Sequence, residues 1–196
     1  MRWERPPMMN AIISLPSWVA EEVDFSKLYA TDEARMRLVI ALARENVARG
    51  TGGPFGAAVF ERNSGVLVSV GVNSVVRLNN CTLHAEMIAF QLAQKRVASY
   101  TLAHDGAKHG PHEMFTSCAP CAMCLGATLW SGVERIVCAA GREDAEKIDF
   151  DEGPVFAESY AYLESRGVRI VRDFMRDESR EVLEHYRAMG GLVYNG

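Results

Sequence analysis

The sequence lacks any apolar run that approaches the roughly 18 residues needed by a membrane-spanning helix. Its first residues carry positive charges, but Glu4, Pro6 and Pro7 interrupt them before an apolar stretch typical of a secretion signal can form. We therefore expect a soluble cytoplasmic protein without a membrane partner.

An excess of positive charge is also missing. The 21 lysine and arginine residues are outnumbered by 25 aspartates and glutamates, and the net charge is -4. Long nucleic acids usually bind to broad basic surfaces. This balance argues against a nucleic acid partner and favours a small-molecule substrate.

Cysteine is scarce, and its arrangement argues against a disulfide framework. The chain has five cysteines, an odd number, and three of them fall between Cys118 and Cys124. Thiols crowded in this way are typical of a metal site in a reducing compartment.

Helices and strands are predicted to alternate along most of the chain. Apolar residues recur at helical spacing between Thr31 and Gly50, which are suited to begin and end a helix. A β-hairpin is expected at 57–61 and 66–72. The other expected elements are helices at 84–97, from 120, at 155–166 and at 176–189, and strands at 113–116, 135–140 and 168–171. This order predicts an α/β fold with three layers, αβα, around a mixed sheet of about five strands.

A chain of 196 residues is suited to one compact domain. Residues 1–30 show no sustained period, and we expect an extended arm anchored by Trp3 and Trp18. The predicted catalytic domain covers residues 31–175. Residues 176–196 are expected to form a C-terminal helix and tail.

Two cysteines lie three positions apart where a helix is predicted to begin. Cys121 and Cys124 therefore share one face and can reach one metal ion, and Pro120 is suited to the first helical position. The pair alone is also compatible with a redox site, a structural zinc site, or an iron–sulfur site that includes Cys118.

His84 and Glu86, at the start of another predicted helix, favour a catalytic zinc site over these alternatives. Three protein ligands, His84, Cys121 and Cys124, leave the fourth position of a tetrahedral zinc open, as catalytic sites do. Zinc lowers the pKa of its bound water to about 7. Zinc-bound hydroxide is then available to attack a ring carbon that bears an amino group, with Glu86 as the proton carrier.

The same residues carry a family resemblance. His-x-Glu followed by Pro-Cys-x-x-Cys is typical of zinc-dependent nucleobase deaminases, and the chain resembles the cytidine-deaminase-like superfamily, most closely its bacterial guanine deaminases. The similarity covers roughly residues 31–160. Besides the zinc motif it includes, in order, Gly52-Gly53-Pro54-Phe55-Gly56-Ala57-Ala58-Val59, Asn73, residues 116–127, Trp130 and Phe150-Asp151-Glu152.

The resemblance implies roles for residues around the zinc. Glu86 would shuttle protons between water, ring and departing ammonia, and Glu152 would be a second acid at the amino group. Asn73 would hydrogen-bond the purine edge. The other implied substrate contacts are Ala85, the stacking rings of Phe55 and Trp130, and Tyr194 in a C-terminal lid.

The resemblance also implies the reaction. We expect zinc-dependent hydrolysis of guanine to xanthine and ammonia, with amino-triazines such as ammeline as further substrates. One zinc per chain and a homodimer are expected. The alternatives are a deaminase of guanosine, cytosine, cytidine or adenosine in tRNA, and, outside enzymes, a structural zinc-binding module.

Overall fold

A mixed sheet of five strands forms the centre of the protein, in a computed structural model that describes residues 10–104 and 110–194. The strand order is β2-β1-β3-β4-β5. Strand β1 is antiparallel to β2 and β3, while β3, β4 and β5 run parallel. The strands are β1 (Gly56–Glu61), β2 (Leu67–Val72), β3 (His112–Cys118), β4 (Arg135–Ala140) and β5 (Arg169–Val171). The predicted three-layer α/β fold is confirmed.

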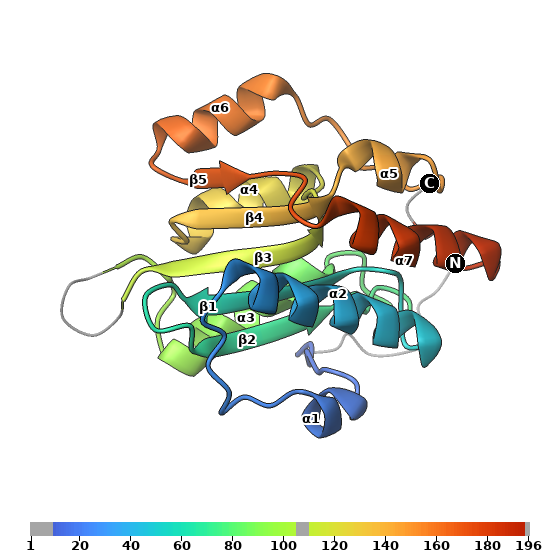
Figure 1. The fold of residues 1–196 in the computed structure, drawn as a ribbon, viewed down its shortest axis with the longest axis horizontal. Helices are drawn as coiled ribbons and strands as arrows, with labels where there is room; N and C mark the ends of the chain where they lie inside the picture. Colours follow the sequence, from blue (N-terminus) through green and yellow to red (C-terminus); the bar gives the residue numbers. More distant parts are fainter. Residues whose placement is uncertain (1–9, 105–109, 195–196) are drawn as a thin grey trace.

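Helices cover both faces of the sheet (Figure 1). Helices α2 (Asp32–Ala48) and α7 (Arg176–Ala188) pack together on one face, whereas α3 (Ala85–Val97) and α4 (Ala122–Ser131) lie on the other. Helix α6 (Ala157–Ser165) packs beside β5, and α5 (Arg142–Glu146) contacts α7. No helix among the described residues is long and apolar enough to cross a bilayer.

Alternation along β1 explains why the sheet has a hydrophobic core on each face. Successive strand residues point to opposite faces. Ala58 and Phe60 accordingly pack in the core that includes α2 and α7. Ala57 and Val59 pack in the core that includes α3 and α4.

The arm before Thr31 is not fully extended where the structure describes it. A five-residue helix, α1 (Trp18–Glu22), forms there, because burial of Trp18 and Val19 compensates for a helix too short to be stable alone. Leu28 bridges to Val66 beside the hairpin. Trp3, the other predicted anchor, lies outside the described residues.

Two helices begin later than their sequence pattern predicts. His84 and Cys121 are the N-cap residues of α3 and α4, each with an extended backbone, and Pro120 precedes the helix that it was expected to open. Helix α5 was not predicted, because five residues are too few for a periodic pattern. Its start is held by the Asp144 carboxylate, which accepts a hydrogen bond from Gly141 N–H.

Candidate active site

The start of β1 and the end of β2 meet at one edge of the sheet, next to the end of β3. Gly56 pairs with Val72 across the antiparallel hairpin. Phe55 and Asn73, one residue further out on each strand, are therefore neighbours, and Asn73 N–H donates a 3.0 Å hydrogen bond to the Phe55 carbonyl. The loop before β1, the loop after β2 and the loop after β3 therefore lie next to one another at this end of the sheet.

The caps of α3 and α4 bring the three predicted zinc ligands together at this edge. The ligand atoms of His84, Cys121 and Cys124 all lie within 4.8 Å of one another. The Nδ1 atom of His84 is 3.5 Å from Cys121 Sγ and 3.7 Å from Cys124 Sγ. One nitrogen and two sulfur donors at this spacing suit a zinc ion with a fourth position open.

The pKa values of the Cys121 and Cys124 thiols are also compatible with a bound cation. Hydrogen bonds from Cys124 and His84 lower the pKa of the Cys121 thiol to about 4, against the effect of burial. The proton shared with Cys121, together with burial, raises the pKa of Cys124. A divalent cation between the sulfurs would replace this shared proton, so the residues fit zinc.

Cys118, the alternative ligand, is arranged differently. Its sulfur contacts the Gly141 carbonyl at 3.5 Å, and it is not part of the three-ligand cluster. Burial raises the pKa of the Cys118 thiol well above its ordinary value. Because the Cys121 sulfur lies in the cluster with His84 and Cys124 and the Cys118 sulfur does not, the structure favours Cys121 over Cys118.

A buried cavity lies beside the ligands and gathers most of the predicted site residues. It is lined by Phe55, Asn73, His84, Glu86, Cys118, Ala119, Cys121, Phe150, Glu152 and Tyr194. The two acids, Glu86 and Glu152, are each 6% exposed. Burial raises the pKa of both, that of Glu152 to about 8, and the nearby Cys121 thiolate contributes. Burial therefore favours the protonated form of the Glu152 carboxyl.

Asn73 presents a free hydrogen-bond donor to this cavity. Its side-chain oxygen accepts a 3.3 Å hydrogen bond from Val75 N–H. Its side-chain nitrogen is buried and has no partner among the described residues. A buried donor without a partner is costly, and a ligand acceptor in the cavity would satisfy it.

The C-terminal tail closes the cavity with Tyr194. The Tyr194 ring packs 5.0 Å from the Phe150 ring, and its hydroxyl is buried with no partner among the described residues. Gly53 makes room for it, since a Cβ there would lie 2.7 Å from the hydroxyl. The cavity volume is about 10 Å³, room for about one water molecule. The site is closed in this structure.

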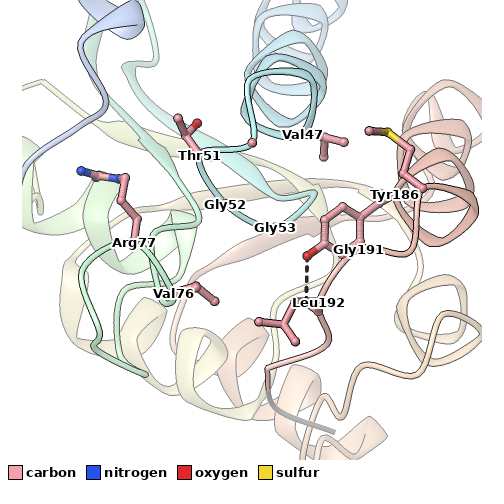
Figure 2. A pocket seen from close by; sticks show the side chains of 11 residues that line it. Val47, Thr51, Gly52, Gly53, Val76, Arg77, Tyr186, Gly191 and Leu192 are labelled. Carbon is pink, nitrogen blue, oxygen red and sulfur yellow. Dashed lines mark hydrogen bonds between the residues drawn. The ribbon is translucent and has the colours of Figure 1, made fainter.

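The tail is held from outside by α7. Figure 2 shows a groove with Thr51, Gly52 and Gly53 on one side and Tyr186 and Leu192 on the other. The Tyr186 hydroxyl donates a 2.7 Å hydrogen bond to the Leu192 carbonyl, drawn as a dashed line (Figure 2). The tail therefore separates this outer groove from the cavity.

Two predicted substrate contacts do not line the cavity. Trp130 is 76% exposed, and its ring extends along the outer surface of α4 toward Gly126. Helical spacing turns it away from the buried face of α4 that carries Cys124. Ala85, the first residue of α3, is buried against β2. A Cβ added to Gly71 of β2 would lie 1.9 Å from the Ala85 carbonyl oxygen.

The sequence interpretation did not single out Phe150 as a site residue. Its ring packs edge-on against Phe55 at 5.1 Å and lines the cavity. The sequence could have indicated this role, because Phe150 directly precedes Asp151 and Glu152 and an apolar residue at that position anchors the loop in the core.

Residues 29–140 match the family described as the cytidine and deoxycytidylate deaminase zinc-binding region. The chain belongs to this family. The matched range contains Glu86 and the three predicted zinc ligands, which cluster in the structure, so the resemblance and the zinc cofactor expected from the sequence are confirmed.

Two guanine deaminases and a structure with a bound purine are among the similar proteins. The guanine deaminase of Bacillus subtilis (strain 168) is 34% identical over 136 residues, which cover 69% of this chain and 81% of that protein. A solved guanine deaminase from Nitrosomonas europaea has 40% identity and a TM-score of 0.86, covering 93% of this chain and 100% of its own. A solved structure in complex with 2,6-diaminopurine has 41% identity and a TM-score of 0.86, covering 94% and 96%.

Proposed function

We propose that this deaminase-family protein hydrolyses guanine to xanthine and ammonia. The observation that carries the proposal is one closed cavity that combines three zinc ligands, two buried acids and the free amide donor of Asn73. The similarity over 93% of the chain to a guanine deaminase supports this substrate. Amino-triazines such as ammeline have a comparable ring and are proposed as further substrates.

Glu86 and Glu152 carry out different proton transfers in the proposed reaction. His84, Cys121 and Cys124 would hold the zinc ion, which as a Lewis acid would lower the pKa of a water molecule. Glu86 accepts one proton from that water and delivers it to the ring nitrogen beside C2. A C–O bond forms at C2 as the water oxygen adds.

Glu152 acts on the leaving amine. Burial raises its pKa and favours the protonated form, which can donate a proton to the exocyclic nitrogen. The C–N bond then breaks, and ammonia departs. The remaining proton of the added hydroxyl restores Glu152, so both protons of the water are accounted for.

The cavity walls suit a flat ring. Phe55 and Phe150 provide rigid apolar contacts at small entropic cost, and Asn73 donates to an acceptor on the purine edge. A purine is far larger than the present cavity, so Tyr194 must withdraw to admit it. We propose that the tail reopens and closes in every cycle.

Incubation of the purified, zinc-replete protein with guanine tests the reaction. We expect equal amounts of xanthine and ammonia. Guanosine, cytosine, cytidine, tRNA and ammeline serve as competing substrates. A folded, zinc-replete sample that releases no ammonia from guanine rejects the proposal, and faster turnover of another member of the panel reassigns the substrate.

Replacement of Glu86 tests the proton carrier. Glu86→Gln is expected to lower kcat by about 10²- to 10⁴-fold, the usual contribution of a general acid–base, while zinc content remains one per chain. Glu33→Gln is the matched control, because Glu33 lies in the first turn of α2 and is exposed. Full activity of Glu86→Gln would contradict the mechanism and favour a structural zinc module.

We further propose a homodimer in a reducing, cytoplasmic environment. Exposed aromatic side chains on α4 and α6, Trp130 at 76% and Tyr162 at 55%, support an interface there. All five cysteines are free, in keeping with a reducing compartment. Light scattering should give twice the chain mass, and Trp130→Asp should give the monomer.

A further inference from the structure

A chain of hydrogen bonds connects the N-terminal arm to the substrate-binding Asn73. Trp18 Nε1 donates to Thr51 Oγ1 at 3.1 Å, and Thr51 Oγ1 donates to Asn46 Oδ1 at 2.7 Å. Asn46 Nδ2 then donates to two carbonyl oxygens, that of Gly53 at 2.9 Å and that of Asn73 at 3.0 Å. Every polar atom of the Asn46 side chain is thereby used.

The donor at one end and the acceptors at the other end allow this series of hydrogen bonds only one direction. An indole N–H can only donate, and a backbone carbonyl can only accept. Thr51 must therefore accept from Trp18 and donate its single proton to Asn46. A flipped Asn46 amide would place its oxygen against two carbonyl oxygens. The N–H of Trp18, by making Thr51 a donor to Asn46, thus reinforces the one amide orientation that holds both loops.

The network is buried at both ends and half-buried at Thr51, which lines the outer groove. Trp18 is 4% exposed, and Asn46 and Asn73 are fully buried. The loop that begins at Thr51 approaches so closely that a Cβ on Gly52 would lie 1.9 Å from the Asn73 carbonyl oxygen. Because Asn46 is fully buried at this contact, we expect removal of a donor that orients it to displace the loops.

The two loops held by Asn46 are those that bind the ring in the proposed reaction. One loop leads to Phe55, whose N–H donates to the Gly53 carbonyl at 2.8 Å. The other carries Asn73, whose side-chain nitrogen lies free in the cavity. Asn46 itself does not line the cavity, so any effect it has must act through its neighbours.

We propose that Asn46 is a positioning residue for Asn73 and that the N-terminal arm, through Trp18 and Thr51, fixes its orientation. The arm is then part of the substrate-binding machinery. This inference rests on the proposed function, because it assigns the effect to recognition of the purine.

Two conservative variants test the inference. Trp18→Phe keeps a buried ring but removes the donor, and Thr51→Val keeps the shape but removes the hydroxyl. Each should raise KM for guanine about fivefold to tenfold, the effect of about one hydrogen bond, with kcat within twofold. Thr101→Val is the matched control, because the Thr101 hydroxyl accepts a local hydrogen bond from Ala103 N–H, and it should leave KM unchanged.

A double-mutant cycle separates positioning from general destabilisation. In the Asn73→Ala background, Trp18→Phe should change KM by less than about twofold, because the residue through which it acts is gone. The inference is overturned if Trp18→Phe and Thr51→Val leave KM unaltered. It is equally overturned if they raise KM by the same factor with and without Asn73.

Hydrogen exchange distinguishes failure of this inference from failure of the proposed function. If the wild-type protein does not deaminate guanine, the proposed function is rejected. Exchange at the amides of Thr51, Phe55 and Asn73, all hydrogen-bonded in this region, should still be faster in Trp18→Phe than in wild type. Unchanged exchange at all three amides overturns the positioning role, whatever the substrate.

Discussion

The backbone N–H of Ala122 donates a 2.9 Å hydrogen bond to the carbonyl oxygen of Glu152. Ala122 is the first residue of α4 and follows Cys121, a predicted zinc ligand. The loop that carries Glu152, the proposed second acid, is therefore tied to the helix start that carries Cys121. This bond holds Glu152 beside the predicted zinc site, 31 residues further along the chain than Cys121.

Glu152→Gln should lower kcat for guanine by about 10²- to 10⁴-fold, because the amide cannot protonate the leaving amine. KM should change much less. The neighbouring acid provides the control: Asp151 is exposed and accepts a hydrogen bond from Gly153 N–H, and Asp151→Asn should retain most activity. A larger loss in Asp151→Asn than in Glu152→Gln would show that Asp151, not Glu152, is the second acid.

Zinc content should distinguish the two candidate cysteine ligands. Cys121→Ser is expected to lose most of its zinc, whereas Cys118→Ser should retain one zinc per chain, because the Cys118 sulfur contacts the Gly141 carbonyl and lies outside the three-ligand cluster. Elemental analysis after dialysis measures both. Iron with visible absorbance in the wild-type protein would instead support the iron–sulfur alternative.

Gly53→Ala should disturb the tail that closes the site. The new Cβ would lie 2.7 Å from the Tyr194 hydroxyl, so Tyr194 must move outward and KM for guanine should rise, as in Tyr194→Ala. Gly126→Ala is the matched control on α4, where a Cβ meets only the Trp130 ring at 3.8 Å. Equal KM values for Gly53→Ala and wild type would argue against a closing role for Tyr194.

Asp32→Asn should destabilise the fold in a pH-dependent manner. Arg135 Nη1 donates to Asp32 at 3.0 Å and to buried Glu113 at 2.8 Å. The bond from Arg135 lowers the pKa of Asp32. A lowered pKa in the folded state stabilises the protein above the ordinary aspartate value of about 3.9 and ceases to do so as pH falls through the folded value.

Chemical denaturation at a series of pH values measures this effect. The difference in free energy of unfolding between wild type and Asp32→Asn should be about 1 kcal/mol at pH 7, modest because the pair is partly exposed, and should shrink below pH about 4. Asp177→Asn is the control, since Asp177 pairs with Arg180 at the surface with 80% of its side chain exposed. A pH-independent difference would contradict the role of the charge.

Local chemistry made much of this protein predictable from its sequence. The spacing of Cys121 and Cys124, with His84 and Glu86 on another helix start, already predicted a zinc site, because ligand type and helix spacing are local properties. Alternating apolar patterns likewise predicted the order of helices and strands.

Only the tertiary structure decided how distant segments meet. It turned Trp130 to the outer surface, placed Tyr194 in the cavity, and joined Trp18 to Asn73 through Asn46, although these residues have no pattern in common along the chain. The physical reason is that such contacts depend on strand pairing and on close packing between loops. Neither can be read from the spacing of residues within one segment.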